Sequence, residues 1–485
     1  MGEIGEKYTP ELEWEYSDFP VKIINLEFET TNWGFGKSAT ITIYKDRNRE
    51  LKGEIEGFVS DFKKNQEESY VGKGNIITGQ IINGIDDKGN IIKINECFFI
   101  NFQSNSYQKS SEGYYTKGTI IFDSLNIKFS TQQPNIRYDW FICHDIPAHF
   151  NETTTRQIKL SPPKVRIGID DYNDSIENLI GSSSSRDYCQ INLSDLTFII
   201  SEVPTEFLNE KTEGLCFEFR ENIYSLDQDF ISGIKWFVSF LLGNELHYIG
   251  NSFIHGEKLV ECNILSHNKS IQESTMPPIK FNFKYEWGNF SFLVNQYLPK
   301  YLDLKESLSL DAALSKYWIS RSLPIGTNLP VLASIIETIA GKYLNKNNIN
   351  QFEYLSKDNY LRLIENEIES IGKKLKSMEG GQIILNKILG AFRKGPNEKM
   401  NVFFNEIGLS IGKLERKALN LRNKMAHSSK DYSCEKDAFN DLILSRAYEI
   451  LFNRVLLKLI GYEGYYIDYS VKGCPLKHID KTVGE

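Results

Sequence analysis

At 485 residues the chain is too long for one ordinary hydrophobic core, so its length predicts about two to four domains. The composition is 41% hydrophobic and 25% charged, which is typical of folded globular proteins and excludes bulk disorder. The net charge of −8 argues against a protein that coats nucleic acid.

A basic window at residues 381–430 stands out against this acidic average. It holds ten Lys and Arg residues against three acids, so the window carries +7 and the rest of the chain −15. A local basic footprint is compatible with a polyanion bound at one place. A solvated basic face explains the same charge equally well, so charge alone leaves both interpretations open.

The sequence carries no clear targeting or cross-linking signal. The first residues are acidic, and the longest apolar runs, such as residues 236–242, are too short to span a bilayer. We therefore expect a cytoplasmic protein with no membrane partner. The seven cysteines are scattered and form no CxxC pair, so we interpret them as small buried side chains rather than disulfides or zinc ligands.

The first half of the chain alternates apolar and polar residues and is rich in β-branched and aromatic side chains. This pattern predicts strands within residues 21–30, 38–45, 75–84, 90–102, 115–130, 196–203, 214–220 and around 247–254. One helix is predicted at residues 227–243, and the serine run at 181–187 is typical of a loop. The first half therefore predicts a sandwich or barrel-like sheet.

From Pro277 and Pro278 onward the period changes to about 3.6 residues, which is typical of amphipathic helices. Helices are predicted at residues 309–322, 328–346, 359–378, 381–395, 411–427 and 436–461. Short loops between long amphipathic helices predict an antiparallel bundle. The expected fold is α+β multidomain, with a β-rich domain at 1–285 followed by an all-α helical bundle at 286–485.

Familiar cofactor motifs are absent from the sequence. It contains neither a GxxxxGK[ST] loop nor a GxGxxG turn between a strand and a helix. His144, Asp145 and His149 look superficially like metal ligands, but Pro147 and the strand-like segment before them argue against a helical metal face. We expect no metal and no cofactor, and the metal-dependent hydrolase stays as a third alternative.

Residues 418–432, ALNLRNKMAHSSKDY, run from the end of a predicted helix into a loop. A helical wheel started at Ile411 gathers the apolar residues in a sector about 80° wide, the expected core stripe: Ile411, Leu414, Ala418, Leu421 and Met425. About 120° to 180° round the wheel lie Arg416, Asn420, Asn423 and His427. Arg422 lies at the edge of the stripe, from which its long side chain can reach around. The wheel predicts that His427 points away from the core of its own bundle.

An Arg, an Asn and a His on a basic surface suit the cleavage of RNA. A histidine can take a proton from a ribose 2′-hydroxyl or protonate the leaving 5′-oxygen at neutral pH. Arginine offers fixed donors to the phosphate as charge builds on it. The pattern also occurs by chance: Arg137 and His144 have a similar spacing in a strand-like segment. A solvent-exposed surface histidine therefore remains the alternative for His427.

The hexapeptide RNKMAH, residues 422–427, resembles the Rx4-6H signature of HEPN ribonucleases. The C-terminal half, including LASIIETIAGKYL at 332–344 and IGYEGYYIDYS at 460–470, resembles the HEPN domain of ApeA-like abortive-infection proteins. The β-rich half, with FISGIKWFVSFLLGNELHYIGNSF at 230–253, is similar to their N-terminal domain. This resemblance implies a metal-independent endoribonuclease used in anti-phage defence.

The resemblance also implies roles for particular residues. Arg422 and His427 are catalytic, Asn423 is the polar residue beside the arginine, and Glu337 matches an acidic position on an earlier helix. The basic window supplies the residues expected to bind RNA: Lys413, Arg416, Lys424, Arg393 and Lys394.

The expected partners are RNA, with tRNA as one candidate, and a second copy of the chain in a homodimer or higher homo-oligomer. In the dimer, two motifs form one composite site. The β-rich domain is expected to act as sensor or regulator, with a phage-derived trigger as its candidate partner. The main rival is a ligand- or partner-binding protein whose HEPN bundle is only a dimerisation scaffold.

Overall fold

The computed structural model describes most of the chain. The described residues are 19–29, 35, 38–46, 49–59, 79–110, 113–146, 156–160, 163–166, 182–183, 188–194, 196–203, 213–220, 223, 226–256, 258–267, 271, 275–281, 289–324, 327–347, 349, 353–425 and 435–484. Within the strands and helices, the side chains of some residues, among them 422–425, are outside this description.

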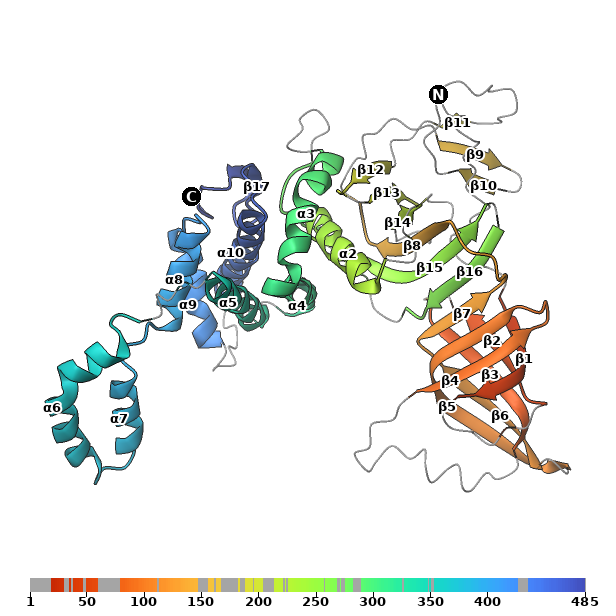
Figure 1. The fold of residues 1–485 in the computed structure, drawn as a ribbon, viewed down its shortest axis with the longest axis horizontal. Coiled ribbons are helices and arrows are strands. Elements are labelled where there is room, and N and C mark those ends of the chain that lie inside the picture. Colours follow the sequence, from red (N-terminus) through yellow and green to blue (C-terminus); the bar gives the residue numbers. More distant parts are fainter. Residues whose placement is uncertain are drawn as a thin grey trace. The chain divides into compact units, whose positions relative to one another are not determined.

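The chain divides into two compact units, and neither is one continuous stretch (Figure 1). The first comprises Met1–Asp227, Asn244–Thr275 and Phe281–Asn295, and the second comprises Gln228–Gly243, Met276–Lys280 and Gln296–Glu485. A helix from the β-rich part of the sequence therefore belongs to the helical unit. The division into functional domains at residue 285 stays a prediction.

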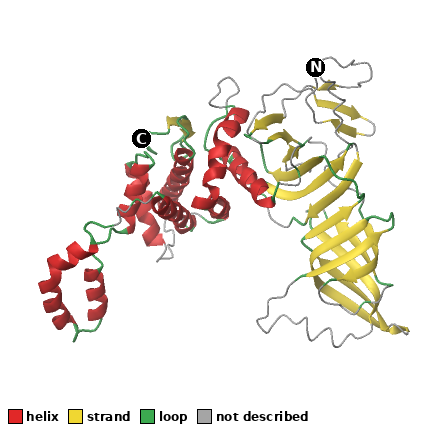
Figure 2. Cartoon of the chain, viewed as in Figure 1, coloured by secondary structure: helices red, strands yellow, loops and turns green. Residues whose placement is uncertain are grey.

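The first unit is built from antiparallel strands (Figure 2). They are β1 (Val21–Phe28), β2 (Thr40–Lys45), β3 (Leu51–Val59), β4 (Gln80–Asp86), β5 (Ile91–Ser110), β6 (Gly113–Ile121), β7 (Ser124–Lys128), β8 (Ile136–Cys143), β12 (Tyr188–Asn192), β13 (Thr197–Glu202), β14 (Glu213–Phe219), β15 (His247–His255) and β16 (Lys258–Leu265). A separate small sheet contains β9 (Arg156–Leu160), β10 (Pro163–Arg166) and β11 (Ser182–Ser183).

Six of these strands close into a barrel, because β6 pairs with both β3 and β5. The ring runs β1–β2–β3–β6–β5–β4 and returns to β1. The long strand β5 also pairs with β7, from which the sheet continues as an open array through β16, β15, β8, β14 and β13 to β12. The barrel-like alternative predicted from the alternating pattern is therefore confirmed.

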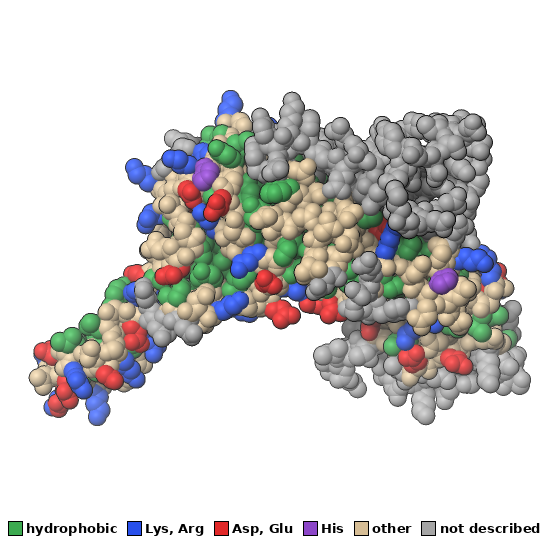
Figure 3. Space-filling model, turned by 45° about the horizontal axis from the view of Figure 1, so that its top comes forward, with side chains coloured by type: hydrophobic (Ala, Val, Ile, Leu, Met, Phe, Trp, Pro, Cys, Tyr) green, Lys and Arg blue, Asp and Glu red, His purple; other side chains and the backbone are tan. Residues whose placement is uncertain are grey.

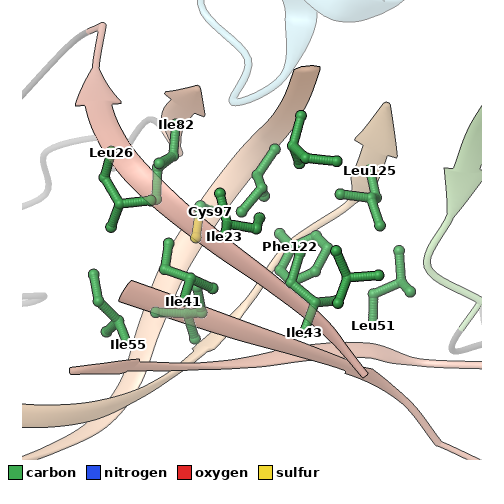
Figure 4. Packing of buried hydrophobic residues seen from close by; sticks show 14 of the residues in the cluster. Ile23, Leu26, Ile41, Ile43, Leu51, Ile55, Ile82, Cys97, Phe122 and Leu125 are labelled. Atoms are coloured by element: carbon green, nitrogen blue, oxygen red, sulfur yellow. The ribbon is translucent and has the colours of Figure 1, made fainter. Parts of the chain in front are cut away.

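Aliphatic side chains fill the barrel, since alternate residues of each strand point inward (Figure 4). In β3 the residues at odd positions from Leu51 to Val59 are all buried. Glycine is needed where two strands approach closely: a Cβ at Gly84 would lie 2.4 Å from Cγ2 of Ile23. The interior of the barrel is thus a packed core.

The second unit is helical. Its elements are α2 (Gln228–Leu242), α3 (Phe290–Leu308, which begins in the first unit), α4 (Leu310–Ser322), α5 (Asn328–Lys346), α6 (Lys357–Leu375), α7 (Gly381–Leu389), α8 (Pro396–Glu406), α9 (Lys413–Met425), α10 (Glu435–Leu459), β17 (Tyr465–Ile467) and β18 (Leu476–His478). Among the described residues, no helix combines the length and the apolar character needed to cross a membrane. The α+β multidomain class is confirmed at this level.

Most predicted helices agree with the structure, and the exceptions have local causes. The helix predicted at 381–395 was wrong in length, since α7 ends at Leu389 and Gly390 follows. Two helices were missed. Pro299 lies inside α3 and hid its pattern, while α8 begins at Pro396, whose fixed φ suits a first helical turn.

The barrel core generates a stability prediction. Ile41 is fully buried inside the barrel, whereas Ile91 is 55% exposed on its surface. Ile41→Ala should lower the free energy of unfolding by about 2–5 kcal/mol, because it leaves a cavity among partners that cannot fully collapse. Ile91→Ala is the matched control and should cost about 1 kcal/mol or less. Urea unfolding of both variants measures the difference, and equal losses would contradict a packed interior.

Candidate active site and nucleic-acid interface

Helix α9, which carries the first residues of the predicted motif, is held by a buried ion pair. The Glu415 carboxylate on α9 accepts a hydrogen bond from the Arg454 guanidinium on α10, and both side chains are 0% exposed. Burial raises the pKa of Glu415, while Arg454 and the backbone N–H of Gly412 oppose that rise. A pair removed from water in this way must be well satisfied by neighbouring groups, because each charge loses its hydration.

The remaining donors and acceptors of the pair are indeed engaged. Arg454 Nη2 donates to the carbonyl oxygens of Ile479 at 2.9 Å and Ser410 at 3.1 Å, and its guanidinium lies over the Tyr466 ring. The second Glu415 oxygen accepts from the backbone N–H of Gly412 at 2.7 Å. One arginine therefore ties α10 to the segment before α9 and to the C-terminal segment. This fixes the rotation of α9 about its own axis.

That rotation turns a basic row of α9 toward solvent. Lys413, Arg416, Lys417 and Asn420 are exposed, while Ala418 is buried against the bundle. The polar face expected from the wheel is confirmed for its described members, Arg416 and Asn420. The core stripe was incomplete, since the charged Glu415 also faces inward. Two of the expected RNA-binding residues, Lys413 and Arg416, thus share one accessible helical surface.

The predicted catalytic residues follow this row in the sequence. Arg422, Asn423 and Lys424 belong to the last turns of α9, but their side chains lie outside the described residues. His427 lies outside the described residues altogether. Arg422 follows Glu415 by seven positions, which is about 10 Å along a helix. The catalytic roles of Arg422, Asn423 and His427 stay predictions.

Glu337, the acidic residue carried over from the resemblance, lies on α5. It is exposed, whereas Ile336 and Ile339 on the same helix are buried. Helix α5 packs against both α9 and α10, so the three helices form one bundle. Glu337 therefore belongs to the same bundle as α9, and its catalytic role stays a prediction.

Arg393 and Lys394 lie on a different element from the α9 row. They follow the turn after α7, where the Arg393 guanidinium sits 5.2 Å from the Phe392 ring centroid. Arg393 is exposed and Lys394 is half-buried. The basic window is therefore spread over several elements, and the role of these two residues in RNA binding stays a prediction.

Sequence reasoning missed one further candidate, Phe439. It lies near the start of α10, which packs against α9, and it is 61% exposed. An exposed aromatic ring can stack on an unpaired base, and such stacking is worth about 1–3 kcal/mol per base. The sequence feature that could have indicated an exposed Phe439 is its position among the polar residues Asp437, Asn440 and Asp441.

The β-rich unit contains two alternatives to the 422–427 site: the chance Arg–His spacing that begins at Arg137, and the suggested metal ligands after β8. Arg137 lies in β8 and donates to the buried Asp139 from Nε at 2.8 Å and from Nη2 at 2.9 Å. Burial raises the pKa of Asp139, which also accepts a bond from the Tyr248 hydroxyl at 2.9 Å. Arg137 is thus engaged in the sheet, as expected from its place in a strand-like segment.

The metal alternative rested on the loop after β8. His144 and Asp145 follow that strand, and the Asp145 carbonyl accepts from the Asn244 amide at 2.9 Å. His149 lies outside the described residues. In the part of the chain that the structure describes, no group of three His, Cys, Asp or Glu side chains is placed to hold a metal ion.

Comparison of the chain with protein families, with curated proteins and with solved structures finds no match. The functional interpretation therefore depends on the residues themselves and on the resemblance carried by the 422–427 motif.

The buried pair generates a prediction about α9. Glu415→Gln should lower the free energy of unfolding of the helical unit by about 3–5 kcal/mol, because it leaves the Arg454 charge buried without its counter-ion. Glu406→Gln, an exposed glutamate of α8, is the matched control and should change it by about 0.5 kcal/mol or less. Thermal unfolding followed by helical circular dichroism measures both.

A double variant distinguishes the loss of stability caused by an unpaired buried charge from the loss caused by poorer packing. Glu415→Leu combined with Arg454→Met should recover most of the loss, since an apolar pair of similar volume carries no desolvation cost. A Glu415→Gln variant as stable as Glu406→Gln would show that the pair does not anchor α9.

Proposed function

We propose that this chain is a metal-independent endoribonuclease of the HEPN type, active in anti-phage abortive-infection defence. The observation that carries the proposal is the exposed cationic row of α9. A buried ion pair sets the rotation of this helix, and the row precedes the last turns of α9, to which Arg422 belongs. A polyanion lying along that row would extend toward the last turn of α9, where the motif begins.

The chemistry follows from the residue types. His427 would take the proton of the ribose 2′-hydroxyl, which then attacks the adjacent phosphorus, and a histidine would return a proton to the leaving 5′-oxygen. Arg422 would stabilise the charge on the phosphate oxygens, and Asn423 would orient them through its amide. The reaction needs a 2′-hydroxyl, so the substrate would be RNA, with tRNA one candidate.

The other parts take supporting roles in this proposal. The basic row and Phe439 would hold the strand, through phosphate contacts and base stacking respectively. The β-rich unit would sense or regulate, with a phage-derived component as its trigger. Two chains would bring two motifs to one scissile phosphate in the cytoplasm. The rival, a non-catalytic scaffold that binds a partner, has the same fold but needs neither Arg422 nor His427.

The first functional prediction concerns the motif. Purified wild-type protein should cleave total RNA in EDTA, and His427→Ala or Arg422→Ala should reduce the rate by about 100-fold or more, the scale of general acid–base catalysis. His478→Ala, a histidine of β18 in the same unit, is the matched control and should keep wild-type activity. Gel electrophoresis of the RNA and thermal melts of each variant supply the readouts.

Two outcomes would contradict the proposal. Full activity in a folded His427→Ala variant would remove the catalytic assignment. Inactive wild-type protein that binds a partner equally well with and without the motif would favour the scaffold.

The second functional prediction concerns the basic row. Each phosphate contact with single-stranded RNA adds about −0.7 to the slope of log affinity against log salt. Reversing Lys413, Arg416 and Lys417 to Glu should therefore flatten the slope by about 2 if all three contact phosphates. Reversing three exposed lysines of the first unit, Lys22, Lys88 and Lys258, gives the same change in net charge and should leave the slope unchanged. If the two triple variants changed the salt slope equally, the row would be a solvated basic face that does not contact RNA.

A further inference from the structure

The hairpin formed by α6 and α7 lacks a buried face of its own. None of the α6 residues is buried, and Gly381 is the one buried residue of α7 within its described range. The two helices pack on each other, and the Tyr360 hydroxyl donates to the Ile388 carbonyl at 2.7 Å. In Figure 1 the hairpin projects from α8 and α9 of its own unit. Helices in proteins gain most of their stability from tertiary packing, and the packing that this hairpin obtains within the described chain buries no residue of α6.

Large apolar side chains remain in water on this hairpin. Leu363 on α6 is 67% exposed, Met378 after α6 is 59% exposed, and Ile383 on α7 is 63% exposed. Figure 3 shows hydrophobic and charged side chains next to one another along the projecting arm. Burying one such side chain contributes about 1.5–3 kcal/mol, so a partner that covers them would be stabilised by contact with the hairpin.

From Glu365 onward, the charges of α6 and of the turn that follows it form two blocks of opposite sign, whereas the first half of α6 carries Lys357, Asp358 and Arg362. Three acids, Glu365, Glu367 and Glu369, precede three lysines, Lys373, Lys374 and Lys376. A helix with this pattern is complementary to an antiparallel copy of itself, because the acidic block of one then faces the basic block of the other. A contact of this kind is isologous, the commonest type in soluble homo-oligomers.

Helical spacing sharpens the complementarity. Positions 363, 367, 370 and 374 follow one another by four, three and four residues, so they form one stripe about 60° wide. A two-fold axis beside Ser370 would place Glu367 against the partner's Lys374 and Leu363 near the C-terminal end of the partner's α6. The small side chain of Ser370 would lie where the two helices cross most closely. Glu369 lies outside this stripe and pairs with Lys373 of its own helix at 2.8 Å.

We propose that the chain self-associates through an antiparallel, two-fold contact between the α6 helices of two copies. Both signs of charge on one stripe favour a second copy over RNA, which would select lysines and arginines alone. This contact is on a different element from the α9 row, and it does not depend on the nuclease proposal. Two-fold contacts at both places would build assemblies larger than a dimer.

The test is a charge-swap cycle on the full-length protein, with the dissociation constant of self-association measured by analytical ultracentrifugation. Glu367→Lys and Lys374→Glu should each raise that constant tenfold or more, because each places like charges opposite one another twice in the assembly. The double variant should restore it to within about threefold of wild type, since the swapped charges again oppose each other.

Glu365→Lys is the matched control, because it makes the same change on the same helix but off the stripe. It should alter the dissociation constant less than threefold, and circular dichroism should show all four variants to be equally folded. A monomeric wild-type protein would overturn the proposal. A double variant as weak as the two singles, or a control as weak as Glu367→Lys, would overturn it as well.

Discussion

The buried pair of Glu415 and Arg454 is the constraint on which the candidate site depends. Its two side chains lie entirely out of water and belong to different helices, and the arginine also holds the C-terminal segment through Ile479. Because the pair sets the rotation of α9, it decides which residues of that helix meet solvent. The exposed lysines and arginine of α9 are therefore a consequence of one interaction in the core of the bundle.

The two units use burial in contrasting ways. The barrel buries a continuous aliphatic core, and its strands approach so closely that Gly84 cannot be replaced without a clash. The hairpin of α6 and α7 buries almost nothing, although it carries apolar side chains such as Leu363 and Ile383. A closed barrel buries its apolar side chains within itself. An open hairpin of this composition gains stability when another protein surface covers its exposed apolar side chains.

Alternation and helical periodicity predicted five of the six barrel strands, most helices of the bundle and the exposed face of α9, since these patterns follow from burial on one side of an element. The barrel strand β3 was missed, because two of its inward positions are occupied by Gly53 and Gly57 rather than by large apolar side chains. Other features could not be predicted from these patterns either. The inward position of Glu415 required its partner Arg454, 39 residues away in sequence, because a glutamate in isolation is expected in water. Helix α3 was not predicted, because it contains Pro299, a residue that usually ends a helix but lies inside this one. The role of His427 rests on its sequence context.

We propose that RNA is cleaved through attack by its own 2′-hydroxyl at the site around Arg422 and His427. The most direct measurement is the chemistry of the new ends after a defined oligoribonucleotide is cleaved in EDTA. The account predicts a 2′,3′-cyclic phosphate on one fragment and a 5′-hydroxyl on the other, with no cleavage when the ribose at that position is 2′-deoxyribose. A 3′-hydroxyl with a 5′-phosphate, or undiminished cleavage of the deoxy substrate, would contradict it.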